Sequence, residues 1–302
     1  MKNNSVAIIL LNWNNFNYTI ECIRSLIKTT YKNKKIFIID NASTDKSVEK
    51  IKKEFPWIHI ILNNKNLGFT GGNNVGIKIA LKEKFDYIML LNNDTVVDKL
   101  FIEPLLNSFD LRTGAVQPLI LNYYNKNIIW NFGGEINKKF GIFKSIGKKK
   151  SIQNLKNLNQ KYTEWISGCC FMIKSSIIEK VGLLDNNFFV YFEDVDWSIR
   201  ISKKKYNLKV VPKSIIYHHE GASWKNKKKS IEGNISPYTH YLNVRNHIYI
   251  LRKHLQMFNI FGVILFQSIK IIAYTLYFIF RLRFKKLSMV YKGLFDALHI
   301  KT

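Results

Sequence analysis

Four short apolar runs organise the first third of the chain, and each ends in polar residues. They are Val6–Leu11, Ile36–Ile39, His59–Leu62 and Tyr87–Leu91. Runs of this length fit strands that are buried on both faces of a parallel sheet. Between them apolar residues recur at helical spacing, as at Ile20, Ile23 and Leu26. This alternation of strand and helix predicts an α/β fold with a doubly wound, mostly parallel sheet.

The residues that follow these strands predict a binding site. Ligands of open α/β sheets sit just beyond the carboxyl ends of the strands. Asn12 and Asp40 end the first two strands, and Asn92-Asn93-Asp94 follows the fourth. A carboxylate such as Asp94 can hold a hard divalent cation there, with phosphate oxygens in other coordination positions. The structural alternative is a simple polar turn, because Asn and Asp are common turn residues.

The middle of the chain is less regular. Ala115–Leu121 predicts a further strand, and the segment to about residue 160 predicts loops and short strands. The glycine-rich stretch of residues 66–74 predicts a loop followed by a helix, and Trp165–Ile173 predicts a strand. An acidic stretch with Glu193, Asp194 and Asp196 leads into a helix, and a later strand ends at His218-His219. A helix is predicted from Tyr238 to His254.

Charge and cysteine content narrow the function classes. The 302 residues carry a net charge of +26, so the partner could be nucleic acid, an anionic lipid surface or a polyanionic substrate. No helix-turn-helix, zinc-finger or RNP pattern is present, so we expect no nucleic-acid partner. The three cysteines predict neither a disulfide framework nor a zinc site. The first apolar run is too short for a signal peptide, which predicts a cytoplasmic protein.

The segment Met257–Phe280 is apolar except for Lys270 and is long enough to span a membrane. Gln267, Lys270, Tyr274, Tyr277 and Arg281 nevertheless form one polar stripe at helical spacing. We therefore expect an amphipathic helix in the membrane plane, with this stripe towards water and the basic cluster of residues 281–286 on anionic lipid. The alternatives are a helix that packs on the rest of the protein and a helix that spans.

The carboxylates at the ends of predicted strands and helices suggest a reaction at a nucleoside diphosphate. A carboxylate beyond a strand end, such as Asp40, can accept a hydrogen bond from N3–H of a pyrimidine. A cation at Asp94 would make a diphosphate a leaving group, and a second carboxylate could deprotonate an attacking hydroxyl. His218 offers a further ligand, because neutral imidazole binds Mn²⁺ and similar metals.

Five motifs together carry a family resemblance. They are DNASTD at 40–45, NLGFTGGNN at 66–74, LLNNDT at 90–95, FEDVDWSIR at 192–200 and YHHEGAS at 217–223. From Val6 to about Asn246 the chain resembles the family 2 glycosyltransferases of GT-A fold, and within them the rhamnosyltransferase-like enzymes of surface-polysaccharide synthesis. Any one of these motifs alone would be weak evidence for the resemblance.

The resemblance implies roles for individual residues. Asp194 matches the catalytic base, Asp94 the metal ligand of the DXD motif, and His218 a histidine of the metal and diphosphate region, with His219 as the rival assignment. This chain departs from the motif at Asn92, where many relatives carry Asp, so we expect Asn92 to contact ribose or sugar hydroxyls. The substrate-binding residues that we predict are Asn12, Asp40, Asn66, Gly68, Gly71, Gly72, Asn73, Asn92, Asn93, Trp165, Gly168, Glu193 and Arg245.

The resulting hypothesis is an inverting, metal-dependent glycosyltransferase. It would use Mg²⁺ or Mn²⁺ and move a sugar, with rhamnose as one candidate, from a dTDP- or UDP-sugar to a glycan or lipid-linked acceptor. Residues 1–250 would form the GT-A domain, with a nucleotide-sugar-binding part at 1–121 and an acceptor-binding part at 122–250. Residues 251–302 would form the membrane-associating extension, on the inner face of the cell membrane.

Three other readings stay open at this point. The chain could be a non-catalytic nucleotide-sugar-binding or scaffold protein of the same fold. It could be an NAD-type oxidoreductase, although Gly71-Gly72 does not have the G-x-G-x-x-G spacing. Glu193 and Asp196 could also do no more than stabilise a helix N-terminus.

Overall fold

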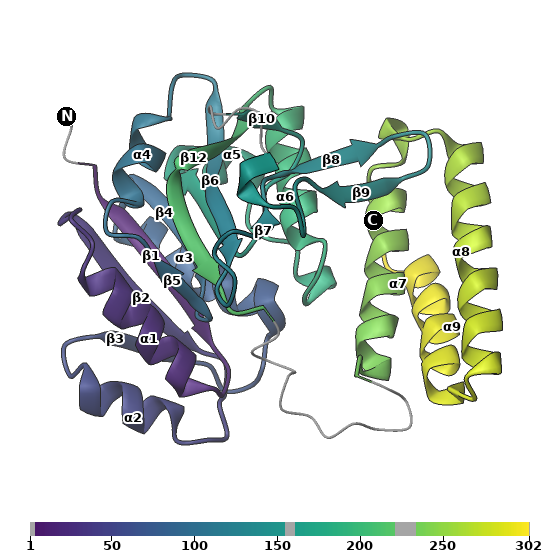
Figure 1. The fold of residues 1–302 in the computed structure, drawn as a ribbon, viewed down its shortest axis with the longest axis horizontal. Helices are drawn as coiled ribbons and strands as arrows, with labels where there is room; N and C mark the ends of the chain where they lie inside the picture. Colours follow the sequence, from purple (N-terminus) through teal and green to yellow (C-terminus); the bar gives the residue numbers. More distant parts are fainter. Residues whose placement is uncertain (1–3, 155–160, 221–233, 302) are drawn as a thin grey trace. The chain divides into compact units, whose positions relative to one another are not determined.

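The computed structural model describes residues 4–154, 161–220 and 234–301 (Figure 1). The last three residues of the motif at 217–223 lie outside them. The chain forms two compact units. The first comprises residues 1–135, 145–189 and 193–223, and the second comprises residues 136–144, 190–192 and 224–302.

The first unit is built on one ten-stranded sheet. Its strands are β1 (Val6–Asn12), β2 (Lys34–Asp40), β3 (His59–Leu62), β4 (Tyr87–Asn92), β5 (Thr95–Val97), β6 (Thr113–Asn122), β7 (Ile129–Asn131), β10 (Lys161–Thr163), β11 (Cys170–Lys174) and β12 (Asn207–His218). The order is β10-β12-β6-β11-β4-β1-β2-β3, with β5 beside β12 and β7 beside β6. The pairs β1–β2, β1–β4, β2–β3 and β6–β12 are parallel, whereas β11 is antiparallel to both neighbours. The predicted mostly parallel sheet is confirmed.

Helices cover both faces of this sheet, as a doubly wound fold requires. One face packs against α1 (Phe16–Ile27), α2 (Ser47–Glu54) and α4 (Ile102–Asn107). The other packs against α3 (Gly68–Lys82), α5 (Ser175–Val181) and α6 (Glu193–Lys203). Successive residues of β1 alternate between the two cores: Ile8 and Leu10 lie in the first and Ala7 and Ile9 in the second. Short 3₁₀ turns occur at Ile152–Asn154 and Asn186–Phe188.

Two predicted boundaries are wrong. The strand expected at Trp165–Ile173 begins only at Cys170, because the preceding backbone N–H groups bond to side chains. Ser167 N donates to Gln117 Oε1 (2.7 Å) and Gly168 N to Asp194 Oδ2 (2.8 Å). The glycine-rich stretch is not a loop, since α3 begins at Gly68.

Gly72 allows α3 to approach the sheet closely. A Cβ at this position would lie 2.3 Å from Leu11 Cδ1 of β1. We expect Gly72→Ala to lower the free energy of unfolding by about 1–3 kcal/mol, the usual cost of overpacking a core. Urea denaturation would measure it, with Lys78→Ala on the exposed side of the same helix as the matched control. Equal midpoints for the two variants would contradict this account.

The second unit is mainly helical. It contains α7 (Pro237–Lys253), a 3₁₀ turn (Leu255–Met257), α8 (Ile260–Phe280) and α9 (Phe284–His299). This unit also contains residues 136–144, at the tip of the hairpin that β8 (Gly134–Asn137) and β9 (Ile142–Ser145) form. Ser236 caps α7, and Asn259 caps α8 by accepting from Gly262 N (2.8 Å). The three helices share a core that contains Val244, Phe278 and Val290.

Part of the polar stripe predicted to face water, at Gln267 and Lys270, is instead turned inward, whereas Tyr277 and Arg281 are exposed. Lys270 Nζ lies 2.8 Å from His247 Nδ1 of α7, and the side-chain N and O of Gln267 are buried. Burial lowers the pKa of Lys270 to about 8 and that of His247 to about 3, so the neutral imidazole can accept from the lysine. The expectation was wrong because periodicity identifies the two sides of a helix but not which of them packs.

Candidate active site

The carboxyl ends of β1 and β2 meet in a cluster around Asp40. Asp40 Oδ1 accepts from Asn12 Nδ2 (2.8 Å) and Ser43 Oγ (2.6 Å), and Oδ2 accepts from Ser43 N (2.9 Å). Asn12 and Asp40 are both buried. A carboxylate has about four acceptor positions, so three bonds leave roughly one for a ligand. The predicted contact of Asp40 with a pyrimidine stays a prediction.

The chain leaves these strand ends in strained backbone conformations. Asn14, Asn15 and Ala42 have φ of 58°, 57° and 60°. Such left-handed residues cost of order 1–3 kcal/mol each and gather at functional sites. Their position directly after β1 and β2 marks this edge of the sheet as the place to look for a ligand.

Thr19 of α1 links the ends of β1 and β4. Its Oγ1 donates to Asn12 Oδ1 (2.6 Å) and accepts from Asn93 Nδ2 (2.7 Å). Asn92 ends β4, and its backbone N donates to Cys169 O (2.9 Å). The structure thus connects Asn12, Asp40 and Asn93 through hydrogen bonds, and Thr19 was missed by the sequence analysis.

Asp94, which follows β4, lies beside His218, the last residue of β12. The antiparallel pairing of β5 with β12 places His218 opposite Thr95, and His218 Nε2 is 3.1 Å from Asp94 Oδ1. Both side chains are buried. Burial alone would raise the pKa of Asp94, but the imidazole of His218 outweighs it and holds that pKa below its usual value. The carboxylate is therefore ionised at neutral pH.

The donor set fits a divalent cation. The Nδ1 atom of His218 is buried without a hydrogen-bond partner, while its Nε2 faces Asp94 Oδ1 at 3.1 Å. A buried polar atom without a partner is costly unless a ligand satisfies it. One carboxylate and one imidazole suit Mn²⁺ and similar metals. Among the described residues no three His, Cys, Asp or Glu side chains gather as a metal site. A cation here would thus need donor atoms from its substrate and from water as well.

His219, the rival ligand, is engaged elsewhere. Its Nε2 is 3.0 Å from Glu21 Oε2 of α1, and Tyr123 stacks on its ring with centroids 3.6 Å apart. Tyr123 OH donates to the other oxygen of Glu21 (2.8 Å). His219 N donates to Asp94 O (3.0 Å), so this arrangement also holds the Asp94 segment in place. No sequence pattern marks Glu21, because its partners lie 102 and 198 residues away.

Asp194 lies in the first turn of α6. Its Oδ2 accepts from Gly168 N (2.8 Å) and its Oδ1 from Val195 N (2.8 Å). Burial raises the pKa of Asp194, although these backbone N–H groups work in the opposite direction. A carboxylate with a raised pKa is a better proton acceptor, as general-base catalysis requires.

Strained backbone also precedes Asp194. Phe189, Tyr191 and Phe192 have φ of 64°, 76° and 70°. Phe189 O accepts from Thr70 N of α3 (3.1 Å), and Asn246 Nδ2 of α7 donates to Tyr191 O (3.0 Å). Strain held by surrounding hydrogen bonds before a carboxylate is a common feature of active sites.

Asp196 and Glu193 are buried next to Asp194, and Asp196 has a structural partner. Its Oδ2 pairs with Arg200 Nε at 2.8 Å, and Arg200 NH2 donates to Leu183 O (2.8 Å). Glu193 begins α6. This ion pair gives Asp196 a structural role, and the helix N-terminus interpretation stays open for both residues.

The glycine-rich motif also has structural reasons for its residues. Gly68 has φ of +70°, and a Cβ there would lie 2.5 Å from Phe189. A Cβ at Gly71 would lie 2.7 Å from Leu67 Cβ, and Asn73 Nδ2 donates to Phe69 O within its own helix (2.9 Å). Asn66 Oδ1 accepts from Asn41 Nδ2 (2.8 Å) and from Gly68 N (2.8 Å). Substrate binding by these residues stays a prediction.

Trp165 and Arg245 make contacts within separate units. Trp165 packs on Gly134, where a Cβ would lie 1.8 Å from its ring, and its Nε1 donates to Glu135 O (3.4 Å). Arg245 of α7 lies over the Tyr241 ring and donates to Asn246 Oδ1 (2.8 Å). These contacts explain both side chains without a ligand, so their predicted substrate roles stay predictions.

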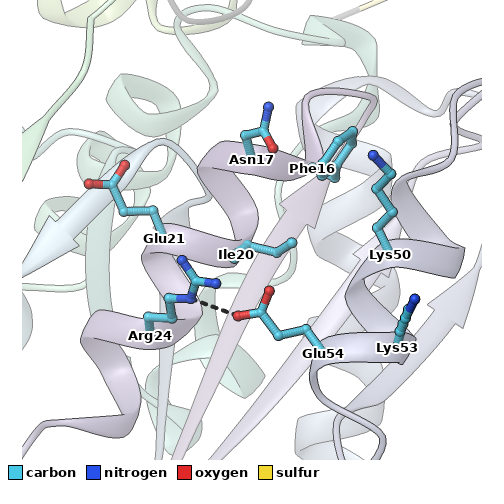
Figure 2. Close-up of a pocket in the computed structure, with 8 residues that line it drawn as sticks. All are labelled: Phe16, Asn17, Ile20, Glu21, Arg24, Lys50, Lys53 and Glu54. Carbon is cyan, nitrogen blue, oxygen red and sulfur yellow. Dashed lines mark hydrogen bonds and ion pairs between the residues drawn. The ribbon is translucent and has the colours of Figure 1, made fainter.

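A surface hollow between α1 and α2 is separate from the predicted site (Figure 2). Arg24 and Glu54 form an ion pair across it (2.6 Å), and Lys50 Nζ lies 4.1 Å from the Phe16 ring centroid. None of the predicted catalytic, substrate-binding or metal residues lines this hollow. It reads as an open, charged groove between two helices.

Comparison with known families gives one family match. The model described as glycosyl transferase family 2 matches residues 5–182, which is more than half of the chain.

Curated relatives are glycosyltransferases of glycan synthesis. A low-salt glycan biosynthesis hexosyltransferase, Agl10, of Haloferax volcanii is 26% identical over 209 residues, covering 67% of this chain and 63% of its own length. An N-acetylglucosaminyl-diphospho-decaprenol L-rhamnosyltransferase of Mycobacterium tuberculosis is 24% identical over 221 residues, with 67% and 71% covered. The chain thus spans less than two thirds of the first of these relatives.

Solved structures agree on the fold. GalNAc-T7, determined with UDP, GalNAc and Mn²⁺, superposes with a TM-score of 0.61 at 19% identity, over 82% of this chain and 48% of that one. The mannosyltransferase PcManGT of Pyrobaculum calidifontis, in complex with GDP-Man and Mn²⁺, gives 0.56 at 13% identity, over 98% and 76%. The predicted GT-A fold is confirmed.

Proposed function

The chain belongs to glycosyl transferase family 2, and we propose that it is an inverting, metal-dependent enzyme of cell-surface glycan synthesis. It transfers a sugar from a dTDP- or UDP-sugar to a hydroxyl of a glycan or lipid-linked acceptor. The observation that carries this proposal is Asp194, a carboxylate whose pKa burial raises at the start of a helix. The names of the relatives support the acceptor class, since one is named for a decaprenol diphosphate sugar. Rhamnose is one candidate for the transferred sugar.

Asp194 is the proposed general base. Gly168 N and Val195 N fix its carboxylate by one hydrogen bond to each oxygen. The acceptor hydroxyl gives its proton to this carboxylate while its oxygen attacks the anomeric carbon. One in-line displacement with a single base inverts the configuration at that carbon, because no second nucleophile intervenes.

Asp94 and His218 are the residues that would hold the divalent cation, Mg²⁺ or Mn²⁺. When bound, the cation supplies charge neutralisation for the departing diphosphate. The ionised carboxylate of Asp94 and one ring nitrogen of His218 would be its protein donors. His219, Glu21 and Tyr123 would keep this segment in position through their contacts with one another and with the Asp94 backbone.

The nucleotide binds along the carboxyl ends of β1, β2 and β4 in this proposal. Asp40 accepts N3–H of the pyrimidine at its remaining acceptor position, while Asn12 and Ser43 hold the carboxylate. Asn92 and Asn93 contact ribose or sugar hydroxyls. Binding of dTDP- and UDP-sugars with Mn²⁺ should raise the melting temperature, because a ligand of the native state stabilises it. No shift with any donor of the panel would contradict the donor site.

His218 and His219 can be distinguished by metal affinity. We expect His218→Gln to weaken Mn²⁺ binding by at least the roughly 10–100-fold that loss of an outer partner of a metal site costs. Titration followed by electron paramagnetic resonance would measure it. His219→Gln is the matched control and should weaken binding less. The reverse order would make His219 the ligand and Glu21 the carboxylate that orients it.

The proposed location is cytoplasmic, peripheral on the inner face of the cell membrane. Among the described residues α8 is long and apolar enough to cross a membrane, by length and composition alone. The net charge of +26 favours an anionic surface. A lipid-linked acceptor also requires the enzyme to work beside a membrane.

A further inference from the structure

The outer side of α8 is mainly apolar, with Ser268 and Tyr277 as exposed polar side chains among the described residues of the helix. Its large exposed side chains are Phe261, Ile264, Leu265, Ile269, Ile272, Leu276, Ile279 and Phe280. They recur every three or four residues, so they lie along one side of the helix. Lys270 is the single charged residue of α8, and it is turned inward to His247. The exposed side therefore carries no charge over the whole helix.

Helix α9 extends this surface. Its large exposed apolar side chains, Phe284, Tyr291, Phe295 and Leu298, also follow helical spacing. Tyr291 OH and Thr275 Oγ1 of α8 are 2.9 Å apart, which places the two exposed stripes side by side. Figure 1 shows α8 and α9 as neighbouring helices joined by a short turn. Together these residues form what we call the α8–α9 apolar face, and it exceeds the scattered apolar residues of an ordinary soluble surface.

Basic residues lie where the two helices join. Arg281 and Lys285 are exposed beside Phe280 and Phe284. An apolar surface with cations at its end matches a membrane interface, where acyl chains meet anionic headgroups.

We propose that the α8–α9 apolar face lies in the plane of an anionic membrane, inserted into one leaflet, with the turn at residues 281–285 on the lipid headgroups. This inference rests on the membrane-peripheral location given under the proposed function. It does not depend on the sugar-transfer reaction. It reverses the orientation expected from the sequence for Gln267 and Lys270, which lie on the protein-facing side of α8, whereas Arg281 of the same stripe is exposed at the turn. The contact positions the enzyme beside a lipid-linked acceptor.

The surroundings of α8 argue against spanning. A spanning α8 would carry its partners α7 and α9 into the hydrocarbon, and with them Arg245, Lys286 and Lys292. Charged side chains at that depth cost several kcal/mol each by insertion measurements. A helix that lies in one leaflet does not carry these residues to that depth.

A second copy of the chain fits the face less well than a membrane does. Association of two copies would bring together molecules of net charge +26, and such a charge opposes self-association. The same charge attracts the chain to anionic lipid. The basic turn adds to this attraction at the apolar face itself.

Vesicle cosedimentation of the full chain tests the proposal. It should bind vesicles of phosphatidylcholine with phosphatidylglycerol more strongly than vesicles of phosphatidylcholine alone. The double variant Ile269→Glu and Ile272→Glu should lose at least tenfold in partitioning, because it places charges in the centre of the face. Replacing Arg281 and Lys285 by Gln should lower partitioning to the anionic vesicles by roughly fivefold for each charge removed.

The matched control is Leu100→Glu with Leu111→Glu, which adds the same charge at exposed apolar positions of the first unit. It should bind vesicles like the unchanged protein, and melting temperatures should show that every variant folds. Equal binding by both double variants would overturn the proposal. A concentration-dependent dimer that only the α8 variant loses, without vesicle binding, would overturn it in favour of a second copy, and resistance to carbonate extraction would overturn it in favour of spanning.

Soluble turnover separates this proposal from the proposed function. The α8 double variant should release diphosphate from a nucleotide sugar in detergent-free solution as fast as the unchanged protein. Loss of vesicle binding with retained turnover is the expected result. Vesicle binding without any turnover would leave the membrane face standing and contradict the enzymatic function instead.

Discussion

Asp194→Asn should reduce the turnover number by roughly 10²–10⁴-fold, the usual cost of losing a general base. The amide keeps the shape of the side chain but cannot take the proton of the acceptor hydroxyl. Donor affinity should change little, since the carboxylate binds Gly168 N and Val195 N and is assigned no contact with the nucleotide. Single-turnover kinetics and donor titration would separate the two effects.

Asp196→Asn is the matched control for this variant. Asp196 lies on the same helix and pairs with Arg200 at 2.8 Å, so its loss should lower the melting temperature but spare the chemical step in the folded protein. If both variants lose turnover to the same extent, or if Asp194→Asn loses donor binding equally, Asp194 is not the base.

The pH dependence gives a second measure of Asp194. Burial raises its pKa, so protonation removes the base at a higher pH than for an exposed aspartate. The rate should therefore fall as the pH drops through a value above about 3.9, the ordinary aspartate pKa. This acid limb of kcat should be missing from the residual activity of Asp194→Asn. An unchanged limb in the variant would assign it to another group.

Asp94→Ala should abolish metal-dependent turnover and reduce Mn²⁺ affinity. Asp94 supplies the ionised oxygen of the Asp94–His218 pair, and it follows β4 where no apolar core is lost. The melting temperature in the absence of metal should stay within a few degrees of the unchanged protein. Calorimetric titration with Mn²⁺ and a diphosphate-release assay would measure the two effects.

Asp98→Ala controls for the loss of a carboxylate near the same strands. Asp98 lies four residues further on and interacts with Tyr217. It should leave Mn²⁺ affinity unchanged. Near-normal activity of Asp94→Ala would show that the cation, if used, is held elsewhere.

Local pattern predicted the sheet well because buried strands leave a strong signal. The apolar runs at Val6–Leu11 and Tyr87–Leu91 correspond to β1 and β4, and their polar ends meet at one edge as parallel strands must. The failures came where long-range contacts decide. The chain before Cys170 bonds to Gln117 and Asp194 and so cannot pair as a strand.

Site residues could be predicted where they belong to a recognisable sequence motif. They could not be predicted where their role depends on partners far away in the sequence. Asp94 and His218 stand in recognisable motifs, and the pairing of β5 with β12 brings them to 3.1 Å. Glu21 and Thr19 carry no such mark, since each acts through residues from other strands and loops. The orientation of α8 was missed for the same reason. The contact of Lys270 with the distant His247 shows which side of the helix faces the protein.

The central claim, sugar transfer from a nucleoside diphosphate donor, is tested most directly by diphosphate release. The protein would be incubated with a panel of dTDP- and UDP-sugars and a lipid-diphosphate-linked sugar acceptor, with Mn²⁺ or with EDTA. For at least one donor we expect diphosphate and glycosylated acceptor in equal amounts, with an inverted anomeric configuration, with Mn²⁺ and not with EDTA. Asp194→Asn should slow both by roughly 10²–10⁴-fold. Binding of donors without release under any condition, or release that the Asp194 variant retains in full, would contradict the account.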